Sequence, residues 1–583
     1  MKNISGIAAE ESLAPFDRAF FDPLHRFKYI GSGSLGGKAQ GLAFIQRTLT
    51  SAFPYDKFPF MEVSIPSLTV LRTDIFDSFL DRNRLNEVAY SDTSDDFLAY
   101  AFQKAELPAE ILGDLRAMVE QVRSPLAIRS SSLLEDAVHE PFAGIYTTKM
   151  IPNNQPSPDE RFRKLSDAIK LVYASTFFKA AKDYARAAHQ DIRREKMAVI
   201  IQEVVGQLFN GRYYPQLSGV ARSFNFYSMG RSKPEDGVVS LALGLGKTIV
   251  DGDRVWTYSP AYPKVAPPFG SAEALLKETQ TEFWAVNMGK PPAYDPIRET
   301  EYLVKGTLRD AELDETLRHS ASTYDPISRK ISIGTGTKGP RAITFAPLLD
   351  SNETPVNAVI RSLLSLCTQA MGSPVEIEFA MTFNPNRFGF LQVRPMVVSR
   401  EQVDVHADEM KEVRALLASE QALGNGLIET IRDIVYVKPS SFDAKFTRRI
   451  AAELENFNRT LANEGRPYLL IGFGRWGSSD PWLGIPVQWG QIGGANVMVE
   501  AVLPNMNVDL SQGSHFFHNL TSFQVKYFCV PYEGEYPIKW ELLEQHQTVH
   551  ETEFVRQVML PFPLQVKVDG RSGRGVILMP SHG

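Results

Sequence analysis

One stretch of the chain, residues 125–148, constrains the fold more than any other; it reads PLAIRSSSLLEDAVHEPFAGIYTT. Its short apolar run at residues 126–128 predicts a buried β-strand that delivers Arg129 into three consecutive serines. A glycine turn and a second β-rich segment follow. An arginine, several hydroxyls and a glycine turn between two strands suit an anion such as a polyphosphate. An ordinary hairpin with polar turn residues would show the same pattern, so the rest of the chain has to decide.

The size and charge of the chain exclude several classes of protein. The chain has 583 residues, of which 43% are hydrophobic and 22% charged, so it has enough apolar content for buried cores. At roughly 100–200 residues per domain, three or four domains are expected. The net charge of −6 argues against a general nucleic-acid binder, which usually carries a basic excess.

The two cysteines and the N-terminal segment predict the compartment. Cys367 and Cys529 lie far apart, without the spacing of a disulfide framework or a zinc site, which suits a reducing cytosol. The first residues lack the apolar core of a signal peptide, and no apolar run approaches the roughly 18 residues that span a bilayer. We therefore expect a cytoplasmic protein that binds neither membranes nor nucleic acid.

A glycine-rich segment near the N-terminus is a second candidate anion site. The residues FKYIGSGSLGGKAQGL predict a short strand, a turn and a helix, and the glycines satisfy G-x-G-x-x-G, although no clean βαβ unit follows. The Walker A pattern fails, because Lys38 is followed by Ala39. What remains is Lys38 at a glycine-rich helix start, where backbone N–H groups favour phosphate. A flexible turn with a solvated lysine is the alternative.

A predicted hairpin carries a third polar cluster. The segments VEIEFAM and GFLQVRP predict two strands joined by the turn NPNR. Glu376 and Glu378 share one strand face, and Gln392 and Arg394 share the matching face of the next strand. Paired acids on a buried sheet are costly without a cation, and Mg²⁺ that carries a nucleotide is the natural partner. A solvated hairpin with cross-strand ion pairs would also explain these residues.

The remaining pattern predicts the domain organisation. Apolar periodicity predicts helices near residues 94–123, 161–190, 355–371 and 443–463, with Gly372 as a helix stop, and a buried strand at 197–206. A second glycine turn before Lys247 also fails the Walker A pattern and is better explained as a strand-to-turn element. We divide the chain into a leader (1–25), two halves of one domain (26–200 and 201–400), a linker (401–425) and a C-terminal domain (426–583).

Four of these segments together resemble one family. They are Gly36-Gly37-Lys38, then Arg129-Ser130-Ser131 with Glu135-Asp136 and Phe142-Ala143-Gly144, then Gly244-Leu245-Gly246, and last Glu376-Ile377-Glu378-Phe379 with Leu391-Gln392-Val393-Arg394-Pro395. In order and rough spacing the set is similar to the N-terminal nucleotide-binding domain of phosphoenolpyruvate synthase and pyruvate phosphate dikinase, which has an ATP-grasp fold. The resemblance covers about residues 26 to 400.

The resemblance implies a role for each matching residue. Lys38 and Arg129 would hold the phosphates of ATP. Glu376 and Glu378 would serve Mg²⁺ and the nucleotide, with Glu376 at a position where the family usually has Asp. Gln392 and Arg394 would lie beside the transferred phosphates.

The family next passes phosphate to a histidine on a swivelling domain. The most similar segment here is Gln512-Gly513-Ser514-His515-Phe516-Phe517, which lacks the family's second glycine. His515 is therefore our candidate phosphate carrier, and a packed or capping histidine is the alternative. Too few residues follow this segment for the family's C-terminal barrel of roughly 200 or more residues, so we expect the chain to lack it.

We thus predict a mixed α/β (α+β) protein with an ATP-grasp nucleotide-binding domain and a smaller mixed α/β C-terminal domain, for which a swivelling phosphohistidine domain is one interpretation. We expect an ATP- and Mg²⁺-dependent phosphotransferase of the dikinase type, with Arg129, Arg394 and His515 as catalytic residues. The alternative is a regulatory module that binds ATP without turning it over. The sequence indicates neither the final acceptor nor the oligomeric state.

Overall fold

The structure is a computed structural model, and its described residues are 13–18, 26–132, 145–187, 190–225, 232–251, 253–265, 272, 275–276, 279–290, 292–350, 354–396, 403–478, 480, 482–503, 506, 520, 523, 525–532, 534–570 and 572–580. Segments 133–144 and 511–519, and with them His515 and the motif residues at 135–136 and 142–144, lie outside the described residues. The fold is mixed α/β, as predicted, with sheets of both parallel and antiparallel strands.

The first sheet holds the strand of Arg129. It has six strands in the order β1-β2-β4-β7-β5-β6: Ala14–Pro15, Phe27–Ile30, Leu68–Leu71, Met197–Glu203, Leu126–Ser132 and Lys149–Ile151. β7 forms because its apolar, β-branched run is buried on both faces, with β4 and β5 paired antiparallel on its two sides. Six helices of this half are α3 (Thr73–Arg82), α4 (Asn86–Tyr90), α5 (Asp95–Lys104), α6 (Ala109–Gln121), α7 (Pro158–Ser175) and α8 (Lys179–Ala187).

The second sheet holds the predicted hairpin. Its order is β12-β11-β10-β18-β19-β3: Trp256–Tyr258, Val238–Ala242, Leu217–Arg222, Val375–Thr382, Arg387–Pro395 and Glu62–Ser64. β18 and β19 pair antiparallel, as predicted, and α13 (Val356–Met371) ends at Gly372, whose φ of 66° is typical of a glycine cap. β3 comes from the first predicted half, so the first half contributes one strand to the sheet of the second half.

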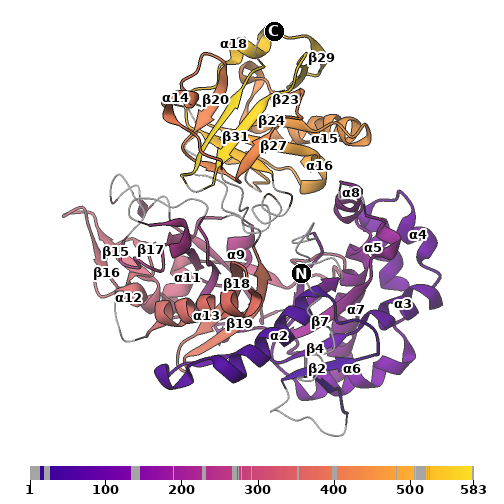
Figure 1. The fold of residues 1–583 in the computed structure, drawn as a ribbon. Coiled ribbons are helices and arrows are strands. Elements are labelled where there is room, and N and C mark those ends of the chain that lie inside the picture. Colours follow the sequence, from indigo (N-terminus) through magenta and orange to yellow (C-terminus); the bar gives the residue numbers. More distant parts are fainter. Residues whose placement is uncertain are drawn as a thin grey trace.

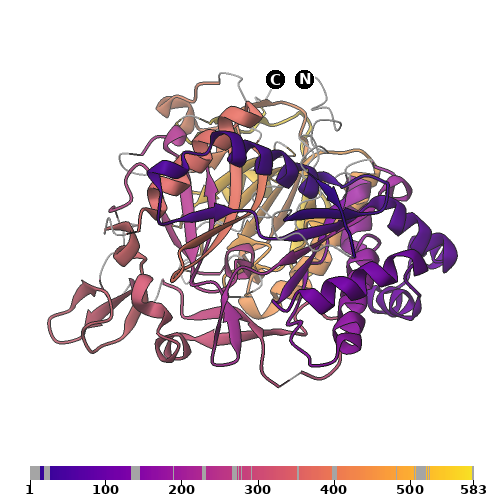
Figure 2. The ribbon, with the colours of Figure 1, turned by 90° about the horizontal axis from the view of Figure 1, so that it is seen from below.

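Helix α2 (Gly37–Ala52) connects these two sheets. It contacts both β5 of the first sheet and β19 of the second, and Figure 2 shows it running from one sheet onto the other. Its buried side chains are on one stripe, which includes Leu42, Ile45 and Leu49. They share a hydrophobic core with residues of β10, β18 and β19. The start of α2 therefore lies where the two sheets meet.

Two smaller sheets belong to the second predicted half, residues 201–400. One has the order β14-β13-β9-β8 (Leu303–Thr307, Glu282–Asn287, Arg212–Tyr214 and Gln207–Phe209), and the other the order β16-β15-β17 (Lys330–Ile333, Ala321–Asp325 and Arg341–Ile343). Short helices accompany them: α9 (Lys247–Val250), α11 (Leu308–Leu313) and α12 (Ala346–Leu349).

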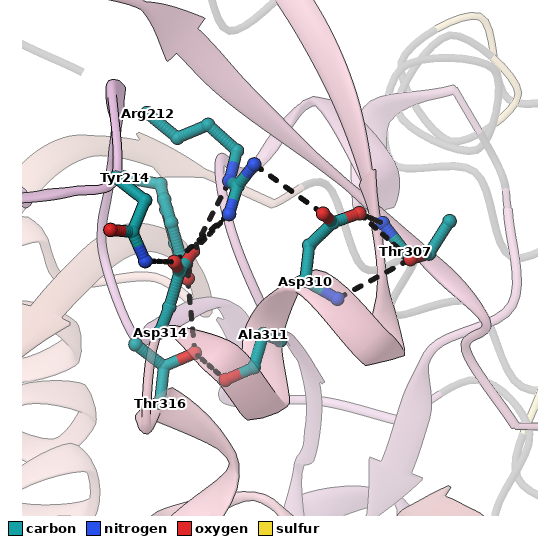
Figure 3. A network of polar contacts seen from close by, with 8 residues as sticks. Arg212, Tyr214, Thr307, Asp310, Ala311, Asp314 and Thr316 are labelled. Carbon is teal, nitrogen blue, oxygen red and sulfur yellow. Dashed lines mark hydrogen bonds and ion pairs between the residues drawn. The ribbon is translucent and has the colours of Figure 1, made fainter.

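A buried carboxylate fastens the β8–β9 hairpin to α11 (Figure 3). The Asp314 side chain is fully buried. It accepts hydrogen bonds from Asn210 (2.7 Å), from the Arg212 guanidinium (2.9 to 3.1 Å) and from the Tyr214 hydroxyl (2.8 Å). Because each of these donors comes from the hairpin, the network fixes the small sheet on the helix that follows it.

The C-terminal unit lies above the two preceding halves of the chain in Figure 1. Its seven-stranded sheet has the order β21-β28-β27-β24-β23-β30-β29: Ala422–Leu423, Lys526–Val530, Ala495–Ala501, Tyr468–Phe473, Asp433–Val437, Val555–Met559 and Thr548–Glu551. A four-stranded sheet packs on it, in the order β20-β32-β31-β22: Ala415–Ser419, Arg574–Leu578, Gln565–Asp569 and Gly426–Ile428. The remaining described elements include β25 (Arg475–Trp476), β26 (Gly484–Ile485) and helices α14 (Ala407–Met410), α15 (Thr447–Asn463), α16 (Trp489–Ile492) and α18 (Trp540–Glu544).

Two strands of this unit lie in the predicted linker at 401–425. β20 pairs with β32 and β21 pairs with β28, so these residues are part of the C-terminal sheets. We therefore propose a C-terminal unit that includes residues 403–425. It contacts the first half through α16 and α8, and Lys179 of α8 forms an ion pair with Glu455 of α15. No helix among the described segments is long and apolar enough to cross a membrane.

Candidate functional site

The glycine-rich turn at residues 31–34 binds a carboxylate of the chain itself. Asp74, in the first turn of α3, accepts hydrogen bonds from the backbone N–H groups of Ser32 and Gly33, each at 2.9 Å. Burial raises the pKa of Asp74, but these hydrogen bonds outweigh burial, and the pKa lies below its usual value. The N–H of Ser34 donates to the Thr73 hydroxyl at 2.9 Å. These three N–H groups thus bind side chains in the first turn of α3.

The start of α2 is pressed against β5. Gly36 has φ 75° and ψ 170°, a backbone conformation that is essentially restricted to glycine. A Cβ on Gly36 would lie 1.7 Å from the carbonyl oxygen of Ser131. The Ser131 hydroxyl accepts a hydrogen bond from the N–H of Ala39 (3.0 Å) and donates one to the carbonyl of Leu35 (2.9 Å). Ser131 of β5 therefore binds both the turn before α2, at Leu35, and the first turn of α2, at Ala39.

This contact places Lys38 beside the Arg129 strand. Lys38 is buried, and its Nζ donates to the hydroxyl of Ser130 at 3.3 Å. Ser130 directly follows Arg129 on β5. The structure thus brings Lys38 to the strand that carries Arg129, although 91 positions separate the two residues in the sequence.

Arg129 joins the two sheets. One of its terminal nitrogens, Nη1, donates to Gln202 of β7 (3.2 Å) and to the backbone carbonyl of Leu391 on β19 (2.9 Å). The other, Nη2, donates to the amide oxygen of Gln392 at 2.7 Å and lies 3.6 Å from Glu378. The guanidinium fork therefore spans from the first sheet to the second, which a lysine could not do with one nitrogen.

A row of three charges crosses the second sheet. Arg222 on β10, Glu376 on β18 and Arg394 on β19 are directly opposite one another in the strand register. Arg222 Nε donates to Glu376 Oε2 at 2.6 Å. Arg394 donates to Glu376 Oε1 through Nε, at 2.7 Å, and through Nη2. All three side chains are buried, and each carboxylate oxygen of Glu376 faces an arginine.

The neighbouring row contains the second glutamate. Glu378 and Gln392 are opposite each other, two residues along from the first row. The Glu378 carboxylate lies 3.6 Å from Arg394 and 3.6 Å from Arg129, and its side chain is 16% exposed. The predicted convergence of two carboxylates, an amide and a guanidinium on one hairpin face is therefore present. Among the described side chains of the two rows and Arg129, three guanidinium groups face two carboxylates, which leaves one net positive charge in this set.

The carboxylates of this junction suit only a metal site in which a nucleotide supplies further oxygen ligands. Among the described residues, no group of three or more His, Cys, Asp or Glu side chains gathers as a metal site. Mg²⁺ in nucleotide sites is typically bound by one or two carboxylates together with phosphate oxygens. Glu378 fits this arrangement, since no hydrogen bond from the described part of the chain reaches its carboxylate. Glu376 fits it poorly, because both its oxygens accept hydrogen bonds from arginines.

The second glycine turn has a local structural role. Gly244 has φ 83°, and a Cβ there would lie 2.7 Å from the carbonyl oxygen of Trp284. Lys247 forms an ion pair with Asp251 at 3.0 Å. Burial lowers the pKa of Lys247, but the nearby carboxylates of Glu299 and Asp251 outweigh burial and raise it. The strand-to-turn interpretation describes this segment well.

Sequence reasoning missed three residues of the junction: Arg222, Asp74 and Gln202. Arg222 is the last residue of the apolar segment LSGVAR, and a single charged residue in that position suggests the solvent-exposed end of a strand. Only the register of β10 against β18 shows that it faces Glu376. His515 lies outside the described residues, so its surroundings are not part of this site.

Two mixed sheets that meet at an arginine-rich junction define a mixed α/β protein. The family model described as "Pyruvate phosphate dikinase, AMP/ATP-binding domain" matches residues 32–415, which is more than half of the chain. The chain belongs to this family. The resemblance drawn from the four motifs is therefore confirmed.

A curated relative matches a smaller part of the chain. The "Uncharacterized phosphotransferase YvkC" of Bacillus subtilis (strain 168) is 25% identical over 189 residues. The alignment covers 32% of this chain and 20% of the relative.

Proposed function

We propose that this chain binds Mg-ATP at the junction of its first two sheets, in an ATP-grasp arrangement, and transfers a phosphoryl group from it. One observation carries the proposal: Arg129, Glu378, Gln392 and Arg394 converge between β5 and β19. The family membership and the name of the Bacillus relative, a phosphotransferase, support it. The second sheet would then cover the nucleotide from one side and the first sheet, with α2, from the other.

The roles of the residues follow from their charge and position. Phosphoryl transfer requires mainly alignment and neutralisation of charge. Arg129, Arg394 and Lys38 would bind phosphate oxygens, and Gln392 would orient Arg129 through the hydrogen bond between them. Glu378 would hold Mg²⁺, which when bound neutralises phosphate charge.

The acceptor is either a histidine of the chain or a small molecule. We propose His515 as the carrier, because Gly513-Ser514-His515 resembles the family's phosphohistidine segment. A neutral imidazole is a competent nucleophile near its unperturbed pKa of about 6.5. His518, three residues further along, is the nearest alternative within the chain.

Labelled ATP tests this proposal. The protein is incubated with β- and γ-labelled ATP and Mg²⁺, and its intact mass is then measured. A dikinase-type enzyme with a histidine carrier should gain one phosphoryl group that is stable in base and lost in acid. The adduct should disappear in His515→Ala; loss in His518→Ala instead would move the role to that residue.

The same experiment separates the regulatory alternative from the enzyme. Stoichiometric ATP binding without loss of phosphate and without any adduct would support an ATP-binding regulatory module. Release of labelled phosphate to an added small molecule, without a protein adduct, would support direct transfer. Absence of ATP binding by calorimetry at any Mg²⁺ concentration would reject the proposed function.

A further inference from the structure

Glu376 and Glu378 share one strand face, yet the structure gives them different surroundings. The carboxylate of Glu376 accepts hydrogen bonds on both oxygens, from Arg222 on one side and Arg394 on the other. The carboxylate of Glu378 accepts none from the described residues, and its two guanidinium neighbours lie at 3.6 Å. The two side chains differ in burial as well, at 2% and 16% exposure. A single shared role as a pair of metal ligands does not fit these differences.

A metal ion at Glu376 would have to displace an arginine. Mg²⁺ requires close contact with its oxygen ligands, at roughly 2.0–2.1 Å. Such contact would remove at least one hydrogen bond from a guanidinium group that is itself buried.

The charge of the row explains why Arg222 is needed. A buried carboxylate has to be paired, and Glu376 with Arg394 alone would form a neutral pair. Such a pair would offer little attraction to a phosphate. With Arg222 on the opposite side, Glu376 is shared between two guanidinium groups, and the row keeps one net positive charge next to Glu378 and Arg129.

We infer that Arg222 is a positioning residue: it holds Glu376 as a fixed counter-ion, keeps Arg394 aligned and cationic toward the phosphates, and leaves Glu378 as the carboxylate for the metal. Arg222 acts through Glu376, whereas Arg394 and Glu378 reach the ligand directly. The inference rests on the proposed function for the identity of the ligand. Its structural part, the coupling of Arg222 to Glu376, does not depend on that function.

The first test compares the two glutamates. Calorimetry of ATP binding over a series of Mg²⁺ concentrations is carried out on the wild type, Glu376→Gln and Glu378→Gln. Glu378→Gln should raise the Mg²⁺ concentration required for half-maximal binding by about tenfold. This change corresponds to a loss of about 1.4 kcal/mol of binding free energy. Glu376→Gln should leave that concentration unchanged. An equal shift in both variants would show that Glu376 is a metal ligand and would overturn the inference.

The second test addresses Arg222 itself. Arg222→Met should weaken ATP binding by about tenfold at saturating Mg²⁺, since Glu376 then neutralises Arg394. Arg222→Lys, which keeps the charge, should recover part of the affinity, and so should Arg222→Met combined with Glu376→Gln. Wild-type affinity in Arg222→Met would overturn the inference.

Arg212→Met is the matched control for these variants. It also removes a guanidinium from a buried carboxylate of the same half, Asp314, but contacts none of the junction residues named above. It should lower stability and leave the ATP affinity of the folded protein as in the wild type. A loss of affinity in Arg212→Met equal to that in Arg222→Met would mean that general destabilisation explains both, and would overturn the inference.

Unfolding in denaturant separates failure of the inference from failure of the function. The wild type, Arg222→Met, Glu376→Gln and the double variant form a double-mutant cycle. The double variant should be more stable than the sum of the single effects predicts, because neither charge is left unpaired. Additive effects would overturn the inference even if ATP binds. Absence of ATP binding by the wild type would reject the proposed function, and this cycle would still decide whether Arg222 holds Glu376.

Discussion

Replacing Gly36 by alanine adds one methyl group at the point where α2 meets β5. The backbone of Gly36, at φ 75° and ψ 170°, is in a region that is costly for other residues, by roughly 1–3 kcal/mol. The added Cβ would also lie 1.7 Å from the carbonyl oxygen of Ser131 and 2.4 Å from its carbon. Since these are backbone atoms of a central strand, no side-chain rotation relieves the contact, and α2 has to move away.

The movement would break the contacts of the Ser131 hydroxyl with Ala39 and Leu35. Two hydrogen bonds at about 1 kcal/mol each, added to the backbone strain, give a loss of about 3–5 kcal/mol. Lys38 is the second residue of the same helix and would lose its contact with Ser130. We therefore expect Gly36→Ala to lower both the stability and the affinity for ATP, measured by denaturant unfolding and by calorimetry.

Gly41→Ala is the control on the same helix. Its Cβ would lie 3.4 Å from the carbonyl oxygen of Val393, close to ordinary van der Waals contact. Alanine in a helix interior is favoured over glycine by about 0.8–1.0 kcal/mol, so this variant should be at least as stable as the wild type. Wild-type stability and ATP affinity in Gly36→Ala would refute the reasoning about α2.

Two further predictions concern charged side chains. Asp74→Asn should destabilise the protein at neutral pH. Because the pKa of Asp74 is lower in the folded state, its contribution is present above the usual carboxyl pKa and is lost as the pH falls through the lowered value. The stability difference between variant and wild type should therefore shrink in acid, and a pH-independent difference would contradict this assignment. Lys149→Met leaves Glu301 buried without its cation, since both side chains are at most 2% exposed and their Nζ–Oε2 distance is 2.6 Å. This variant should lose about 3–5 kcal/mol of unfolding free energy, measured in denaturant. Adding Glu301→Gln to it should restore part of that loss. Additive effects of the two substitutions would contradict the pairing.

Local patterns were sufficient for several elements and for the family. The apolar run at 197–206 predicted β7, and the spacing of Val359, Ile360, Leu363 and Cys367 predicted α13 with its glycine cap. The alternation along VEIEFAM and GFLQVRP predicted the hairpin and the shared face of Glu376 and Glu378. These features depend on contacts between residues that are near in sequence, or on one hairpin, and such contacts leave a periodic trace.

Other features depended on which strands pair. The sequence does not show that residues 62–64 join the second sheet, or that β20 and β21, inside the predicted linker, join the C-terminal sheets. These short strands carry too little pattern to select a partner, and their partners lie far away in the sequence.

The sequence by itself determined which residues the proposed chemistry uses: Lys38, Arg129, the two glutamates of β18, and the glutamine and arginine of β19. Only the tertiary structure decided how their charges are distributed. Strand register set Arg222 opposite Glu376, and the approach of α3 gave the amides of the glycine-rich turn to Asp74. The physical reason is that a carboxylate or a guanidinium takes its role from the charges within a few ångströms of it. At this junction those charges come from β5, β10, β18 and β19, strands that the chain reaches at widely separated positions.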